Sequence, residues 1–149
     1  MAKRKEITTG GCLCGAVRYE AEGIPIVVGH CHCETCRKHT GAPIVTFVAF
    51  ESRNVRFTQG NPSHYQSSPN AKRAFCSNCG TPLTWEGDYA GYKIIEFHVS
   101  STDEPDRYPP TFHWHHGERI SWFDSADSLP RYRASSIDAS PYQHSPADS

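Results

Sequence analysis

The seven cysteines of this 149-residue chain constrain its fold more than any other feature of the sequence. They fall into three groups: a C-x-C pair near the N-terminus, a C-H-C-x-x-C cluster, and a C-x-x-C pair in the middle of the chain. An odd number cannot form a complete set of disulfides, and no apolar stretch follows the basic start MAKRKEITTG, as a secretory signal peptide requires. We therefore expect a cytoplasmic protein with free thiols, where clustered cysteines usually bind metal.

The first and third groups, Cys12 with Cys14 and Cys76 with Cys79, predict one site of four thiolates. In an extended segment, residues two apart face the same side, so both sulfurs of the C-x-C pair can reach one ion. Four thiolates in a tetrahedron suit zinc, and a closed site of this kind is structural. Buried thiols or a redox C-x-x-C are less favoured, since a Thr-Pro step follows the pair where a redox motif needs a helix.

The remaining cysteines, Cys31, Cys33 and Cys36, lie within six residues of sequence and can hold a second zinc ion. Three protein ligands leave one coordination position open, which is the layout of a catalytic zinc site. That position would take water or a substrate thiol, and a thiol bound to zinc loses its proton near neutral pH. We expect two zinc ions per chain, the second one partly occupied because three ligands hold a metal less securely than four.

A histidine could instead close the second site and leave it without chemistry. The sequence offers three candidates, His30, His32 and His39. The first two would face away from the cysteines in an extended segment, whereas His39 follows Cys36 by about one helical turn and is the best rival. We favour the open site.

The charge balance argues against two classes of partner. Fifteen Lys and Arg nearly cancel sixteen Asp and Glu, so the chain has no field that would drive binding to nucleic acid or an anionic membrane. No apolar run approaches the roughly 20 residues of a membrane span.

Two basic residues, Arg37 and Lys38, follow the second cysteine cluster. Either they bind the carboxylates of an acidic thiol substrate, or they are ordinary solvated charges.

The pattern predicts a mainly β chain with one short helix. Eleven Gly and eleven Pro indicate many turns, and the apolar runs are short and rich in β-branched and aromatic residues. We expect a single domain over residues 1–133, beginning with a polar lead-in at 1–9, and a serine-rich flexible tail over 134–149. The helix is expected at 34–40. Strands are expected at 16–21, 24–28, 44–50, 55–57, 64–66, 71–75, 82–85 and 94–99, with 111–116 and 120–123 closing the sheet.

These motifs resemble the glutathione-dependent formaldehyde-activating enzyme family, which includes centromere-protein-V-like proteins. The resemblance covers residues 10–132 and rests on GGCLCGAVRYE, CHCETCRKHTGAP, SSPNAKRAFCSNCGTPL, and PPTFHWHHGERISW followed by DSLPRY. It implies a β-tent-like zinc-binding fold of short antiparallel strands with minimal helix, and the same division into four structural and three catalytic zinc ligands. It also implies a carbon–sulfur lyase or synthase, in which glutathione adds to formaldehyde to give S-hydroxymethylglutathione.

His113 lies nine residues before Trp122, a spacing similar to one in this family. Either His113 lines the pocket and moves a proton to or from the adduct oxygen, or it is a strand histidine with a hydrogen-bonded ring, which we favour. With His115 and His116 it forms an HWHH cluster that could attract metal without a native role. We expect Trp114 and Trp122 to be packing residues.

Three functions compete at this point. The favoured one is a zinc-dependent carbon–sulfur lyase or synthase that acts on the adduct of a small thiol, such as glutathione, with a small aldehyde. The alternative is a non-catalytic zinc-binding module that recognises a protein partner, because fold does not fix function. A thiol redox sensor is the third, because zinc thiolates can be oxidised.

Overall fold

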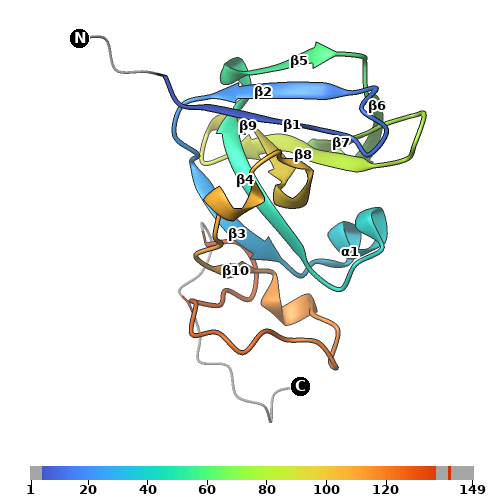
Figure 1. Ribbon diagram of the computed structural model, residues 1–149. Coiled ribbons are helices and arrows are strands. Elements are labelled where there is room, and N and C mark those ends of the chain that lie inside the picture. The colour runs from blue at the N-terminus through green and yellow to red at the C-terminus, as the bar shows by residue number, and fades with distance from the viewer. Residues whose placement is uncertain (1–4, 137–140, 142–149) are drawn as a thin grey trace. The chain divides into compact units, whose positions relative to one another are not determined.

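The computed structural model describes residues 5–136 and residue 141 (Figure 1). It is mainly β, with one α-helix among the described residues, as the composition predicts. The chain forms two compact units, one of Met1–Val27 and Val48–Pro109 and the other of Val28–Phe47 and Pro110–Ser149. Each cysteine group lies entirely within one unit: the four-cysteine group in the first and the three-cysteine group in the second.

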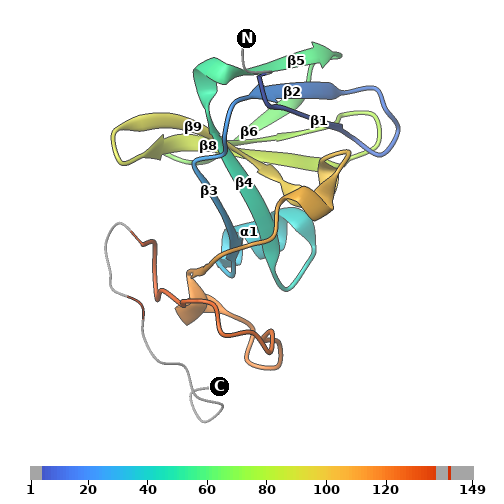
Figure 2. The same cartoon turned by 60° about the vertical axis from the view of Figure 1, so that its left-hand side comes forward.

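The first unit contains antiparallel strands in two sets, visible in both views (Figures 1 and 2). The three-stranded sheet has the order β1-β2-β5, formed by β1 (Ile7–Gly11), β2 (Arg18–Glu22) and β5 (Val55–Gln59). The second set is a meander of β6 (Ser63–Ser68), β7 (Ala71–Phe75), β8 (Pro82–Tyr89) and β9 (Tyr92–His98). The end of β4 (Val45–Glu51) adjoins β9, and short 3-10 turns lie at η1 (Ser52–Asn54), η2 (Val99–Ser101) and η3 (Pro105–Arg107).

Tyr19 is the centre of the core of the first unit. Its ring stacks on Phe97 of β9 with ring centroids 3.7 Å apart, and both side chains are almost fully buried. The hydroxyl shares a 2.7 Å hydrogen bond with Ser101 Oγ, which satisfies its polar end. Gly10 faces Tyr19 across the strand pair, and a Cβ there would lie only 2.5 Å from the Ser101 carbonyl oxygen. The absence of a side chain at Gly10 therefore lets β1 approach this core.

The second unit is organised around β3 (Val27–Cys31), whose residues from Val28 onward belong to it. The short strand β10 (His113–Trp114) runs parallel to β3, and β4 begins on the other side of β3. The rings of Phe47, Phe112 and Trp114 pack together, with centroids 4.8–6.0 Å apart. The 3-10 turn η4 (His116–Glu118) follows β10.

The predicted helix over residues 34–40 is confirmed as α1 (Glu34–Thr40). The side chain of Cys33 caps its N-terminus by accepting a hydrogen bond from the Cys36 amide. Gly41 ends it in a left-handed conformation with φ 68°, and its amide donates to the Arg37 carbonyl. Both end signals are local, which explains why the sequence predicted the helix bounds.

Several segments differ from the expectation: the strand expected at 24–28, for example, is β3 at Val27–Cys31. Residues 7–9, expected to belong to the polar lead-in, form β1 together with Gly10 and Gly11, because their backbone pairs with β2 although ITTGG is not an apolar run. Residues 120–123 form a turn, not a strand, and of 111–116 only two residues pair, in parallel with β3. The predicted tail at 134–149 lies mostly outside the described residues.

Within the described part of the chain, none of the helices is both long and apolar enough to cross a membrane.

Candidate metal centre

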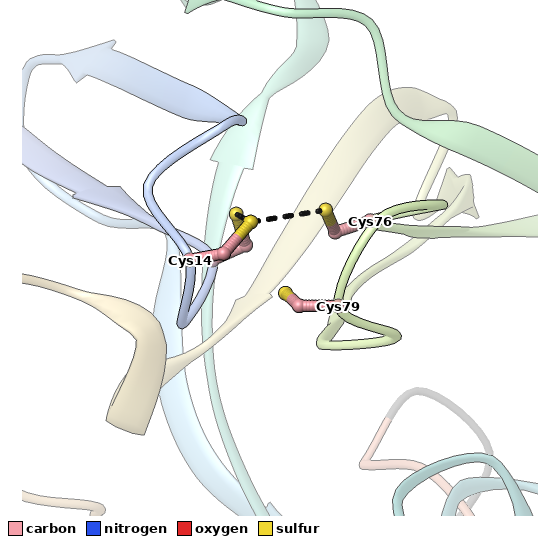
Figure 3. Close-up of side chains that lie close together, drawn as sticks. Cys14, Cys76 and Cys79 are labelled. Atoms are coloured by element: carbon pink, nitrogen blue, oxygen red, sulfur yellow. Dashed lines mark hydrogen bonds between the residues drawn. The ribbon is translucent and has the colours of Figure 1, made fainter.

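The four-cysteine group gathers Cys12, Cys14, Cys76 and Cys79, whose sulfurs all lie within 4.8 Å of one another. Cys12 Sγ lies 3.6 Å from Cys14 Sγ, and Cys14 Sγ lies 3.9 Å from Cys76 Sγ. Figure 3 shows Cys14, Cys76 and Cys79 pointing toward a common centre. A tetrahedral ion with metal–sulfur bonds of about 2.3 Å has sulfurs about 3.8 Å apart. The group therefore fits a zinc ion, and none of these cysteines is in a disulfide.

Two turns supply the four thiols. The C-x-x-C segment closes with a bond from the Gly80 amide to the Cys76 carbonyl, and Gly80 has φ 78°. The C-x-C segment was expected to be extended, and this is wrong: the Gly15 amide bonds to the Cys12 carbonyl, so residues 12–15 also form a turn. Gly15 closes that turn with φ 80°, a conformation that glycine adopts without strain.

Hydrogen bonds to sulfur lower the pKa of Cys12 and Cys79, whereas the pKa of Cys76 is raised. The Val17 amide donates to Cys12 Sγ at 3.2 Å, and Asn78 Nδ2 donates to Cys14 Sγ at 3.3 Å. Bonds from the side chain and the backbone of Thr81 lower the pKa of Cys79 to about 5. Donors aimed at sulfur are the environment that stabilises metal-bound thiolates.

The three-cysteine group brings together Cys31, Cys33 and Cys36, again with all sulfurs within 4.8 Å. Cys31 ends β3, Cys33 caps α1, and Cys36 lies in the first helical turn, so one strand-to-helix turn presents all three. Bonds with Cys31 and Cys36 hold the pKa of Cys33 far below its usual value, whereas bonds with Cys33 and Cys36 raise that of Cys31. Among the residues that the structure describes, no histidine or carboxylate joins this group, which is compatible with an open position.

The two basic residues beside this cluster occupy different environments. Arg37 donates from Nε to the His32 carbonyl and from Nη2 to the Glu118 carbonyl, both at 3.1 Å. Lys38 is exposed and pairs with Glu34 at 3.0 Å, one helical turn away. Arg37 therefore links α1 by hydrogen bonds to the backbone at His32 and Glu118. The ammonium of Lys38 stays accessible to a ligand.

A buried histidine network lies beside the same turn. His113, in β10 and fully buried, bonds through Nδ1 to His32 Nε2 at 2.8 Å and through Nε2 to both carboxylate oxygens of Asp127 at 3.1 Å. This is the arrangement of the second interpretation, a strand histidine with a hydrogen-bonded ring. His116 Nε2 bonds to Asp124 at 3.1 Å, and Arg131 bonds to both carboxylates.

Burial favours the neutral form of His30, His32 and His113. Desolvation, reinforced by the repulsion that a second protonated ring at His113 would exert, lowers the pKa of His30 to about 4 and that of His32 to about 3. Desolvation also lowers the pKa of His113. The carboxyl of Asp127 is partly desolvated, which alone would raise its pKa, but bonds from Ser125, the Leu129 amide and His113 lower it well below its usual range.

Sequence reasoning missed the partners of these rings: Asp124, Ser125, Asp127 and Arg131. They lie in an irregular segment, where no periodicity indicates which side chains turn inward. The quoted motif DSLPRY, residues 127–132, contains two of them, but its spacing carries no signal of a histidine partner. Of the two tryptophans expected to pack, Trp114 is buried, whereas Trp122 is 75% exposed, so that expectation is wrong for Trp122.

A family model matches most of this chain. The model of the family described as glutathione-dependent formaldehyde-activating enzyme matches residues 7–118, which include all seven cysteines. A protein of Schizosaccharomyces pombe (strain 972 / ATCC 24843) named as an uncharacterized lyase is 39% identical over 74 residues. That match covers 50% of this chain and 53% of the relative, so the chain matches about half the length of that protein.

Among solved structures, a crystal structure of a Rhodobacter sphaeroides protein has a similar fold. The TM-score is 0.51 at 25% sequence identity, and the alignment covers 64% of this chain and 87% of that one.

Proposed function

Since this chain belongs to the glutathione-dependent formaldehyde-activating enzyme family, we propose that it is a zinc-dependent carbon–sulfur lyase or synthase of the S-(hydroxymethyl)glutathione type. The observation that carries the proposal is the three-cysteine group, which gathers three soft donors on one turn. Three protein ligands are the number found in catalytic zinc sites, whereas the four-cysteine group matches a structural site. The lyase name of the fission yeast relative supports the reaction class.

In this proposal Cys31, Cys33 and Cys36 hold the catalytic zinc, and Cys12, Cys14, Cys76 and Cys79 hold the structural one. Bound zinc supplies one piece of chemistry, a lowered pKa for a thiol that it binds. The chain's own contribution is to fix the three donors: the end of β3 holds one, the N-cap of α1 holds the second, and the first turn of α1 holds the third. Lys38, exposed beside them, is proposed to attract a substrate carboxylate, with Arg37 contributing its charge.

The reaction is an addition that balances without a further reactant. The thiolate sulfur attacks the aldehyde carbon and forms the carbon–sulfur bond. The π electrons of the carbonyl move to its oxygen, which takes up one proton and becomes the hydroxyl of the adduct. The reverse reaction, cleavage of the adduct, uses the same groups. A cytoplasmic location belongs to the proposal because thiols are kept reduced there.

The test follows exchange between glutathione and its formaldehyde adduct by NMR, with zinc-loaded protein. We expect exchange broadening or magnetisation transfer well above the uncatalysed level, and its loss in Cys36→Ala. The matched control is Asp88→Asn, on an exposed residue of β8 outside both cysteine groups. A panel of other small thiols identifies the substrate. No acceleration with any thiol would contradict the enzyme and favour a non-catalytic zinc module.

A further inference from the structure

We propose that residues 124–134 position the three-cysteine turn through a hydrogen-bonded chain that runs from Asp127 through His113 to His32. This rests on the proposed function only in that the turn is taken as a zinc site. The carboxylates of the segment lie beyond residues 7–118, the part that the family model matches. Asp127, His113 and His32 are thus positioning residues, which act on the ligands through the backbone that carries them.

The direction of the chain follows from the charges. The bonds that lower the pKa of Asp127 keep its carboxylate ionised and so an acceptor, and His113 must donate to it from Nε2. Neutral His113 then has a bare Nδ1, which accepts from the Nε2–H of His32. One ionised carboxylate therefore fixes the tautomer and ring orientation of two buried histidines in series.

The fixed orientation of the His32 ring also restrains the metal ligands, because His32 lies between Cys31 and Cys33. Its amide donates to the Trp114 carbonyl and its carbonyl accepts from Arg37, so its backbone is held as well as its ring. Its ring Nδ1 is buried and has no hydrogen-bond partner within the described residues. A buried acceptor without a donor destabilises the folded state. A polar ring kept there at that cost indicates a role other than stabilising the core.

The segment also binds β10 and the η4 turn by hydrogen bonds. The amides of His113 and His116 donate to the Pro130 and Tyr132 carbonyls, and the Tyr132 amide donates to the His113 carbonyl. His116 Nε2 also bonds to Asp124. The Glu118 carbonyl, at the end of η4, accepts a hydrogen bond from Arg37 of α1, the helix that carries Cys36.

The same residues include a set with metal-ligand chemistry, since one donor atom each of His30, His113 and Asp127 lies within 4.8 Å of the others. Asp127, however, already accepts hydrogen bonds from His113, Ser125, the Leu129 amide and Arg131. Arg131 supplies the positive charge that a cation would bring. The geometry therefore favours a hydrogen-bonded support over a third metal site.

The test replaces Asp127 by Asn, which keeps the shape and removes the charge. Loss of a group that supports a metal ligand by hydrogen bonding typically lowers metal affinity about 10–100-fold. In the zinc-loaded protein we expect Asp127→Asn to release the zinc of the three-cysteine group about 10–100 times faster to a chromophoric chelator, with the release from the four-cysteine group unchanged. Ser125→Ala, which removes one of the bonds to Asp127, should give a smaller change in the same direction.

The matched control is Asp103→Asn, which breaks a comparable carboxylate network with Arg18 and Thr9 in the first unit. It should leave release from the three-cysteine group unchanged. A second readout is amide hydrogen exchange over residues 28–38, which we expect to rise at least tenfold in Asp127→Asn, with or without zinc. Unchanged release together with unchanged exchange would overturn the proposal.

If the wild-type chain holds only one zinc, the proposed function fails. The exchange measurement then decides the positioning role by itself.

Discussion

His32 and His113 share a 2.8 Å hydrogen bond between ring nitrogens, and both side chains are fully buried. Only one proton fits between the two nitrogens, so the two imidazoles cannot both be charged. Asp127 accepts from the far side of His113, which orders the protons along the whole chain. We therefore expect both rings to be neutral, with Nε2 of His32 as the donor and Nδ1 of His113 as the acceptor of their shared hydrogen bond.

We predict that His30 and His32 stay neutral well below their usual pKa. Imidazole nitrogen shifts, measured by NMR between pH 5 and 7.5, should show neutral tautomers, with the proton of His32 and of His113 on Nε2. The physical reason is desolvation, which lowers the pKa of His30 to about 4 and of His32 to about 3. An imidazolium signal from either ring at pH 6 would contradict both the burial and the proton order.

The same shifts make stability depend on pH. A histidine whose folded pKa is depressed contributes stability that is complete above its unfolded value of about 6.5 and is lost as the pH falls toward the folded value. Each ring can therefore lower the free energy of unfolding by up to about 1.4 kcal/mol per pH unit within that window. Urea unfolding between pH 7 and 5 should show the loss. Zinc content must be measured in each sample, because protonation of thiolates acts with the same sign.

We predict that loss of a ligand from the four-cysteine group destabilises the fold more than loss of a ligand from the three-cysteine group. Cys79→Ala should remove one zinc and lower the melting temperature by more than about 10 °C, because binding to a structural site contributes directly to folding. Cys36→Ala should remove the other zinc with a smaller loss of stability. Elemental analysis and thermal unfolding of both variants check this. Equal destabilisation by the two changes would argue against a structural and a catalytic division.

Gly29 offers a test of the packing that supports β3. A Cβ on Gly29 would lie 2.9 Å from Phe112 Cδ2 and 2.5 Å from its Cζ, so alanine must displace that ring. Because Phe112 packs on Phe47 and Trp114, we expect Gly29→Ala to lower the free energy of unfolding by about 1–3 kcal/mol. Chemical denaturation measures the change. Gly117→Ala in the same unit is the control, since its nearest neighbour, the Arg133 carbonyl oxygen, lies at 3.3 Å.

Features encoded in short segments could be predicted from the sequence, and features that depend on distant partners could not. The four and three cysteines divide by spacing alone, and α1 is bounded by a local cap and a local glycine stop. The pairing of His113 with His30 depends on two parallel segments about eighty residues apart, and no local pattern encodes that pairing. Asp127 reaches His113 from an irregular loop, so its role becomes visible only in three dimensions.

The last prediction separates Arg37 from Lys38, which the sequence presents as equivalent cations. Lys38 makes an exposed pair with Glu34, so Lys38→Ala should raise KM for an acidic thiol several-fold and leave kcat and zinc content unchanged. Arg37→Lys keeps the charge but loses the two bonds to the His32 and Glu118 carbonyls, so it should weaken zinc retention at the three-cysteine group.

Steady-state kinetics and chelator competition measure the two effects. Glu34→Gln is the control that frees Lys38 from its ion pair, and it should lower KM if the ammonium binds substrate carboxylate. A KM that stays the same in Lys38→Ala and in Glu34→Gln would remove Lys38 from the substrate site. Zinc loss confined to Arg37→Lys would then leave Arg37 as a positioning residue of the turn.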